Sequence, residues 1–219
     1  MEYALMSLPH ESSGISTTIA AAISSMAARP DDPTVAGSGC AALVTIAEDG
    51  VLCAQAVTVA GGSVAAVTAM LGHPSVVRVQ ATGAAALGAI AAGGAPCAQV
   101  RKMLLQPNRD PSPSPSPSPG PSPSPSPNPD SNPDSDPKQA VVDAKGVEAV
   151  IAALQAHPSE MLVAMAGCGM LRWVAEGSAA FSQLVAEVGG AAAVVAALET
   201  HLSVTGRDSN LEPTDLQIG

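Results

Sequence analysis

The apolar residues of this chain recur every three or four positions, the spacing of a helix that packs along one side. The stretch at 75–92 shows this spacing, and shorter stretches at 52–59 and 63–72 precede it. Gly61 separates the two short stretches, and Pro74 separates the second from the third. Glycine commonly follows a helix C-terminus, and proline disfavours helix in the residue before it. The pattern therefore predicts three consecutive helices.

This three-helix pattern is repeated along the chain. Residues 55–74 read QAVTVAGGSVAAVTAMLGHP, and residues 139–158, which lie 84 positions later, read QAVVDAKGVEAVIAALQAHP. A third copy begins at Gln183, and a degenerate copy ends at Pro30, 44 positions before Pro74. A period of 44 residues explains these offsets once an insertion of 40 residues is subtracted. A period near this length with two or three helices per repeat is typical of an α-solenoid.

The insertion is predicted to be residues 100–139, where serine and proline alternate. Residues 107–137 within it have almost no apolar side chains to bury, so we expect the insertion to be disordered and extended. Every proline within 107–137 has an odd number, so the PxxP spacing that SH3 domains bind is absent. A spacer is the main interpretation, with Ser-Pro phosphorylation or a hydroxylated, glycosylated wall-type segment as alternatives. Residues 97–99 followed by Ala140 match residues 53–56, which predicts that the insertion interrupts the short first helix of a repeat.

Composition and charge favour helices and exclude some partners. Hydrophobic residues make up 47% of the chain and aromatic residues only 1%, which argues against a β-sandwich. The net charge is −10, without the lysine and arginine clusters that bind nucleic acid. No apolar run reaches the roughly 18 residues of a membrane span, and the N-terminus does not resemble a signal peptide. We therefore expect a cytoplasmic protein, or a nuclear one, with neither nucleic acid nor membrane as partner.

Candidate catalytic and metal-binding residues are few. His73, His157 and His201 occupy the same position in three copies, and a metal site would require them to converge. Equivalent positions in stacked repeats stay roughly 10 Å apart, whereas a histidine beside a helix C-terminus can satisfy free carbonyls. The four cysteines include no CxxC pair, which favours reduced core residues. The sequence predicts no catalytic, cofactor or metal site and no small-molecule substrate, so an enzyme is the least favoured class.

The residues that the copies share resemble an armadillo repeat. They are Gly61-Gly62, Ala65-Ala66-Val67, Met70-Leu71, Val79-Gln80 and Ala85-Ala86-Leu87. The resemblance covers 18–99 and 140–202, and the segments 1–17 and 203–219 are expected to be loose. It implies an all-α, armadillo-like α-solenoid, a right-handed superhelix of three-helix repeats with a disordered Pro/Ser-rich insertion.

The resemblance also implies where a partner binds. Many armadillo proteins carry a Trp, and four positions later an Asn, on the third helix, where both line a concave groove. This chain has Ala41, Ala85 and Gly169 at the Trp positions and Thr45, Ala89 and Trp173 at the Asn positions. Recognition of basic nuclear-localisation peptides is therefore not implied. The candidate partner-binding residues are Thr45, Ala89, Arg172 and Trp173; an Arg–Trp pair is typical of a binding hot spot, and the alternative is that Trp173 fills the core.

The expected function is a non-enzymatic protein–protein interaction module or adaptor, which binds other proteins or peptides through the extended face of the repeats. The alternative is a fragment or isoform of a longer armadillo array, with a structural role and little autonomous binding.

Overall fold

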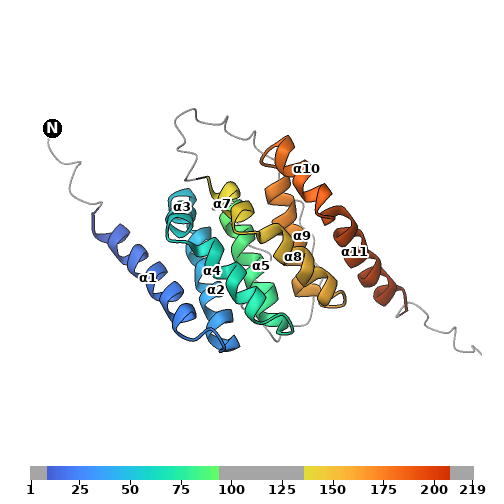
Figure 1. The fold of residues 1–219 in the computed structure, drawn as a ribbon, viewed down its shortest axis with the longest axis horizontal. Helices are drawn as coiled ribbons and strands as arrows, with labels where there is room; N and C mark the ends of the chain where they lie inside the picture. The colour runs from blue at the N-terminus through green and yellow to red at the C-terminus, as the bar shows by residue number, and fades with distance from the viewer. Residues whose placement is uncertain (1–8, 94–135, 208–219) are drawn as a thin grey trace, which may run out of the picture.

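The computed structural model describes residues 9–93 and 136–207, and in these ranges every regular element is a helix (Figure 1). The predicted all-α class is confirmed for this part of the chain. The first group of helices is α1 (Pro9–Ala28), α2 (Pro33–Glu48), α3 (Val51–Val59), α4 (Gly62–Gly72) and α5 (Val77–Ala91). The second group is α7 (Pro137–Asp143), α8 (Gly146–Ala156), α9 (Met161–Ala175), α10 (Ala179–Glu187) and α11 (Gly190–Arg207).

The helices pack in two layers. One layer holds α2, α5 and α9 side by side, and the other holds α1, α4, α8 and α11, with contacts between successive members of each layer. The short helices α3, α7 and α10 lie along one edge, and α1 and α11 lie at the two ends (Figure 1). Helices one sequence period apart are therefore neighbours in space.

A residue in the left-handed conformation separates each short helix from the long helix that follows it. These residues are Gly61 (φ 82°), Lys145 (φ 60°) and Gly189 (φ 93°). The axes of α3 and α4 meet at 66°, and those of α10 and α11 at 64°. Thr17 occupies the equivalent position in the degenerate copy, and there α1 continues as one helix of 20 residues. Glycine adopts positive φ at little steric cost, and Lys145 makes the same turn without glycine.

The glycine that begins each of these long helices has no room for a side chain. A Cβ on Gly146 would lie 2.9 Å from both Cγ1 and the carbonyl oxygen of Val141. Gly62 and Gly190 meet the equivalent valines, Val57 and Val185, in the same way. The same glycine–valine pair therefore builds this turn in all three copies.

The two layers are held together at a second set of glycines. A Met or Leu on α1, α4 or α8 occupies the space that a Cβ would need on α2, α5 or α9. The pairs are Met26–Gly39, Met70–Gly83 and Leu154–Gly167. Small residues at these crossings let the helices approach closely, and α5, between α2 and α9, is buried along the whole stretch 79–91.

A proline follows the C-terminal ends of α4 and α8 and prevents these helices from continuing. Pro74 and Pro158 follow α4 and α8 within two residues, whereas Leu202 occupies the same position in the third copy. Because nothing at Leu202 prevents helix, α11 continues to Arg207. The prediction that the whole segment 203–219 is loose is therefore wrong for 203–207.

The N-terminal boundary also differs from the prediction. Helix α1 begins at Pro9, so residues 9–17 are helical and not a loose segment. Ile15 packs against the core, and Ile19 is fully buried. The remaining parts of the predicted loose ends, 1–8 and 208–219, lie outside the described residues.

The predicted boundary of the insertion is wrong on its C-terminal side. Pro137–Gln139 form the first turn of α7, where the Lys138 backbone N–H donates to the carboxylate of Asp136 over 2.9 Å. Helix α7 contacts α3 and α5, so the units on either side of the insertion are packed together. The segment 100–135 and residues 97–99, which were expected to start this helix, lie outside the described residues.

Candidate functional site

The four predicted partner-binding residues lie near the C-terminal ends of α2, α5 and α9. Thr45 is half-buried, and its hydroxyl donates to the carbonyl of Ala41 over 3.1 Å. Ala89 is 0% exposed, because α5 is enclosed by its neighbours. Its side chain therefore cannot contact a partner, which corrects its place in the predicted set.

Arg172 and Trp173 form one exposed cluster at the end of α9. The Arg172 guanidinium lies 5.2 Å from the centroid of the Trp173 ring, and its Nε donates to Glu176 Oε1 over 2.8 Å. The Arg172 side chain is 67% exposed, whereas Trp173 is half-buried and packs against the core. Trp173 is thus partly packed against the core, and the Arg172 guanidinium lies over its ring.

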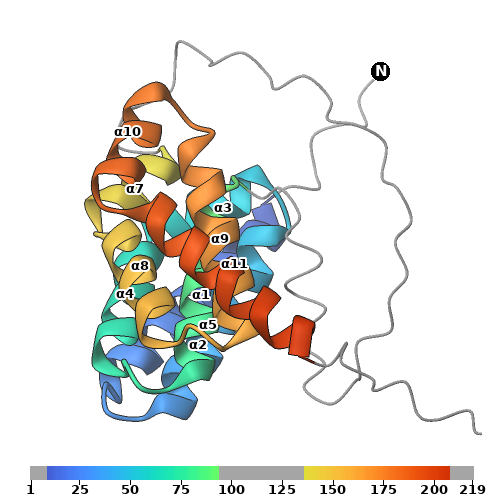
Figure 2. The same cartoon turned by 90° about the vertical axis from the view of Figure 1, so that its right-hand side faces the viewer.

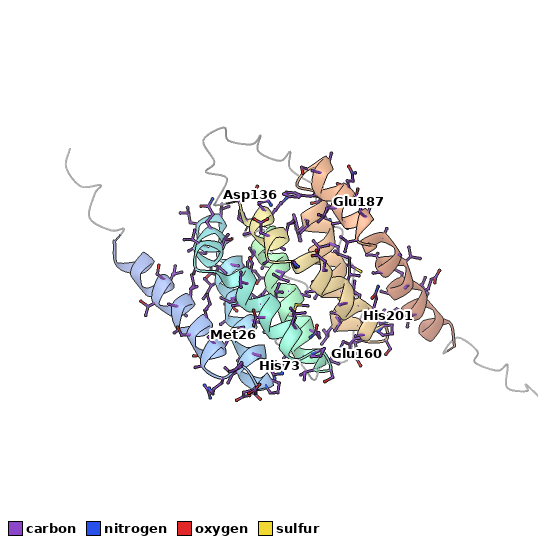
Figure 3. All side chains as sticks on the ribbon, viewed as in Figure 1. Met26, His73, Asp136, Glu160, Glu187 and His201 are labelled. Carbon is purple, nitrogen blue, oxygen red and sulfur yellow. The ribbon has the colours of Figure 1, made fainter. Side chains whose placement is uncertain are left out.

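The three histidines in one repeat position do not converge on a common site. Figure 3 shows His73 and His201 well separated along the row of helices. His157 donates from Nε2 to the carbonyl of Pro74 over 2.7 Å, which links α8 to the preceding unit. This contact reaches a carbonyl two residues beyond the C-terminus of α4, so His157 donates beside a helix C-terminus, but to a helix of the preceding unit. At the same end of α4, the carbonyls of Met70 and His73 also accept hydrogen bonds from the buried side-chain amide of Gln80, at 2.7 and 2.9 Å.

The described cysteines are thiols in packed surroundings. Cys40 is fully buried, and burial raises the pKa of its thiol to about 12. Burial also raises the pKa of the half-buried Cys168. A thiol with a raised pKa stays protonated at neutral pH and is a poor nucleophile. Cys53 is also a free thiol, and Cys97 lies outside the described residues.

Two grooves among the described residues are lined without a paired acid and base. One groove, of about 310 Å³, lies between α1 and α2 and is lined by Ala22, Ser25, Arg29, Thr34, Val35, Ser38, Gly39 and Ala42. A smaller one, of about 80 Å³, lies between α4 and α8 and has mostly apolar walls. Within 9–93 and 136–207, no three His, Cys, Asp or Glu side chains are grouped so that they could hold a metal ion.

None of the described helices is, by itself, long and apolar enough to cross a membrane. Two bent pairs, α3 with α4 and α10 with α11, reach the necessary length and composition only when each pair is counted as one.

Sequence reasoning missed one apolar surface, on α11. Val195 is 52% exposed and Leu198 is 55% exposed, although both belong to the helical pattern of the repeats. Their counterparts in α4 and α8 are buried. The signal was present in the sequence, because residues 203–219 do not repeat the apolar pattern of 75–92.

The chain was compared with protein families, with curated proteins and with solved structures, and none of them matches it.

Proposed function

We propose that this protein is a non-enzymatic protein-interaction module built as an armadillo-like solenoid. Units of three helices repeat with a period of 44 residues, and the same glycine positions form the contacts within each unit. Stacked units of this kind present an extended surface for protein or peptide binding. The third helices α2, α5 and α9 carry that surface, and the protein works in the cytoplasm or nucleus.

The observation that carries the proposal is the Arg172–Trp173 cluster. A guanidinium stacked on an indole offers a flat surface with a positive charge, and such side chains contribute strongly to protein interfaces. Glu176 holds the guanidinium in place through its ion pair. The net charge of −10 favours a partner that is neutral or basic over most of its surface.

The proposal is tested by partner capture from native lysate with Arg172→Ala and Trp173→Ala variants. Arg172→Ala removes an exposed side chain, so it should leave the melting temperature unchanged while capture of the main partner falls several-fold. Trp173→Ala should weaken capture at least as much, with some loss of stability because the ring is half-buried. Arg78→Ala is the matched control. It removes an exposed arginine in the first turn of α5 and should bind normally. Equal capture by all four proteins would contradict the proposal.

A structural role within a longer armadillo array is the second candidate function. The exposed apolar side chains of α11, at a position that is buried in the other units, favour it. An autonomous module should melt in one transition by circular dichroism and tryptophan fluorescence. If the stability depends on further repeats, α9, α10 and α11 should instead unfold first. Trp173 fluorescence should then change at a lower temperature than the circular dichroism signal of total helix.

A further inference from the structure

The solvent-facing sides of α3 and α4 carry large apolar side chains where the two later units carry polar or small ones. Leu52 and Val59 on α3 are 79% and 74% exposed, and Val64 and Leu71 on α4 are 60% and 67% exposed. We call these four side chains the apolar strip. The equivalent residues of α7 and α8 and their flanks are Asp136, Asp143, Glu148 and Gln155, and those of α10 and α11 are Ala180, Glu187, Ala192 and Glu199. The repeat therefore does not need apolar residues at these exposed positions, and a group of them is typical of an interaction surface.

The groove between α4 and α8 adjoins the strip at Leu71. It has a volume of about 80 Å³, and its walls include Leu71, Pro74, Ala152 and Ala156, all of which are exposed. The amide nitrogen of Gln80 in the same wall already donates to two carbonyls at the C-terminal end of α4. The groove therefore suits an apolar side chain. Figure 1 shows α4 and α8 side by side, and Figure 2, a view along the row, shows both to the left of α5 and α9.

Acidic side chains border the strip on its α7–α8 side. Asp136, Asp143 and Glu148 are exposed and occupy the positions of Leu52, Val59 and Val64 one unit later. Equivalent positions on neighbouring packed helices lie roughly 10 Å apart. A helix bound on the strip would therefore have these carboxylates beside one of its flanks.

The charges near this acidic border do not cancel, and the opposite border is uncharged. Lys145 lies in the turn after α7, so the three carboxylates and this ammonium leave a net charge of −2. The side chain of Lys138 extends instead towards the next unit, because its Cδ lies 2.7 Å from the place of a Cβ on Gly177. On the other side of the strip, α1 presents the exposed residues Ala20 and Ala27 at the positions of Val64 and Leu71.

We infer that the apolar strip binds an amphipathic helix of a partner protein, with lysine or arginine along one flank. The apolar residues of that helix lie on the strip, and one of them enters the groove beside Leu71. Its basic flank faces the acidic border, and its other flank, beside α1, is uncharged. This inference goes beyond the proposed function, because it concerns the layer of α4 and α8 and does not depend on the Arg172–Trp173 cluster of α9.

Other occupants match the charge of this surface less well. A further repeat at either end of the row would lie beside α1 or α11, so it would leave the strip between them uncovered. The sequences 1–8 and 208–219 contain no lysine or arginine, and a second copy of the chain has a net charge of −10. An anionic membrane surface would be repelled by the acidic border. A basic amphipathic helix is the occupant that fits both the strip and its border.

The test adds a fluorescent helical peptide of about 18 residues, long enough for an isolated helix, to the full chain. The peptide consists of alanine, of leucine at every third or fourth position, and of lysine along one flank. Fluorescence anisotropy should show saturable binding. Val64→Ala combined with Leu71→Gln gives α4 residues that the later units carry, without a change of charge, and should weaken binding about tenfold or more. Met161→Gln, which changes an exposed methionine at the start of α9, is the matched control and should leave binding unchanged.

A second pair of variants tests the acidic border. Glu148→Gln should weaken binding of the lysine peptide about two- to fivefold, as expected for one exposed charge pair, and should reduce the salt dependence of binding. It should leave unchanged the binding of a peptide with glutamine in place of lysine. Glu160→Gln, which neutralises an exposed acid at the N-terminus of α9, is the matched control.

Several outcomes would overturn the inference. One is no saturable binding, and another is equal binding by the Val64→Ala/Leu71→Gln and Met161→Gln chains. Equal weakening by Glu148→Gln and Glu160→Gln would show attraction to the overall negative charge only. A dimer in sedimentation analysis that the strip variant converts to a monomer would assign the strip to a second copy. Binding that appears only after deletion of residues 100–139 would assign it to the inserted segment, and flotation with phosphatidylcholine–phosphatidylserine vesicles would assign it to a membrane.

Two controls separate this result from other effects. Melting curves of the variants verify the fold, since the substituted side chains are at least half exposed. Trp173→Ala should bind the peptide as the unchanged chain does, so the failure of one proposal is distinguishable from the failure of the other.

Discussion

At the residue scale, glycines define the repeat more strictly than the apolar residues do. Val67, Ile151 and Val195 differ in side chain or in burial, yet the glycine at the start of each long helix meets the same valine in all three copies. A β-carbon there has no free space, since the nearest atoms include a backbone carbonyl oxygen that cannot rotate away. Substitutions at these positions are therefore expected to destabilise the fold.

Gly146→Ala and Gly169→Ala should change stability in opposite directions. At Gly146 the new Cβ would lie 2.9 Å from the Val141 carbonyl oxygen, so we expect destabilisation of about 1–3 kcal/mol. At Gly169, in the middle of α9, a Cβ meets nothing within 4 Å, so the helix preference of alanine should add about 0.5–1 kcal/mol. Urea unfolding of the two variants measures both effects, and destabilisation of the same size by both would refute this packing argument.

At the element scale, the sequence pattern predicts the helices of complete copies well. The expected stretches 52–59, 63–72 and 75–92 correspond to α3, α4 and α5 to within two residues at each end. The errors arise where a copy departs from the pattern. The pattern treats every copy as ending at a proline, so the continuation of α11 past Leu202 was not foreseen. The Asp136-Pro137 start of α7 is an ordinary capping signal that was hidden among the alternating prolines.

The site was less predictable than the helices. Ala89 was selected from its position in the repeat, and the pattern of one chain segment does not show that α2 and α9 enclose α5. Arg172 and Trp173 were selected from side-chain type, and the structure brings them into contact with each other. The open surface of α11 could be recognised only after the partners of Met70 and Leu154 were known.

Deleting residues 100–139 should leave the thermal stability unchanged or slightly higher. The deletion joins Gln99 to Ala140, so Cys97–Gln99 take the place of Pro137–Gln139 and restore the pattern of α3. Deleting 97–139 is the matched control, because it removes both segments that can form the first turn of this helix, and it should lower the melting temperature. Melting curves by circular dichroism compare the two. A large loss of stability in the first variant would show that the inserted segment contributes to the packing.

At the scale of the whole molecule, the described helices form a row of similar units with a closed interior, and α11 leaves Val195 and Leu198 exposed. Helix α5, which lies between α2 and α9, separates the Arg172–Trp173 cluster from the groove between α1 and α2. In such a row each unit contacts only its neighbours, so stability and binding depend on local interfaces. The central claim is that this row, and not the inserted segment, binds the partner.

The most direct test of this claim is quantitative capture from native lysate with the full chain and with the chain lacking residues 100–139. We predict that both forms retain the same discrete partner in similar amounts, because the row is continuous across the insertion. A partner retained only by the full chain would contradict the claim and assign binding to the Ser-Pro segment. Capture of nothing by either form would contradict autonomous binding and favour the structural role within a longer array.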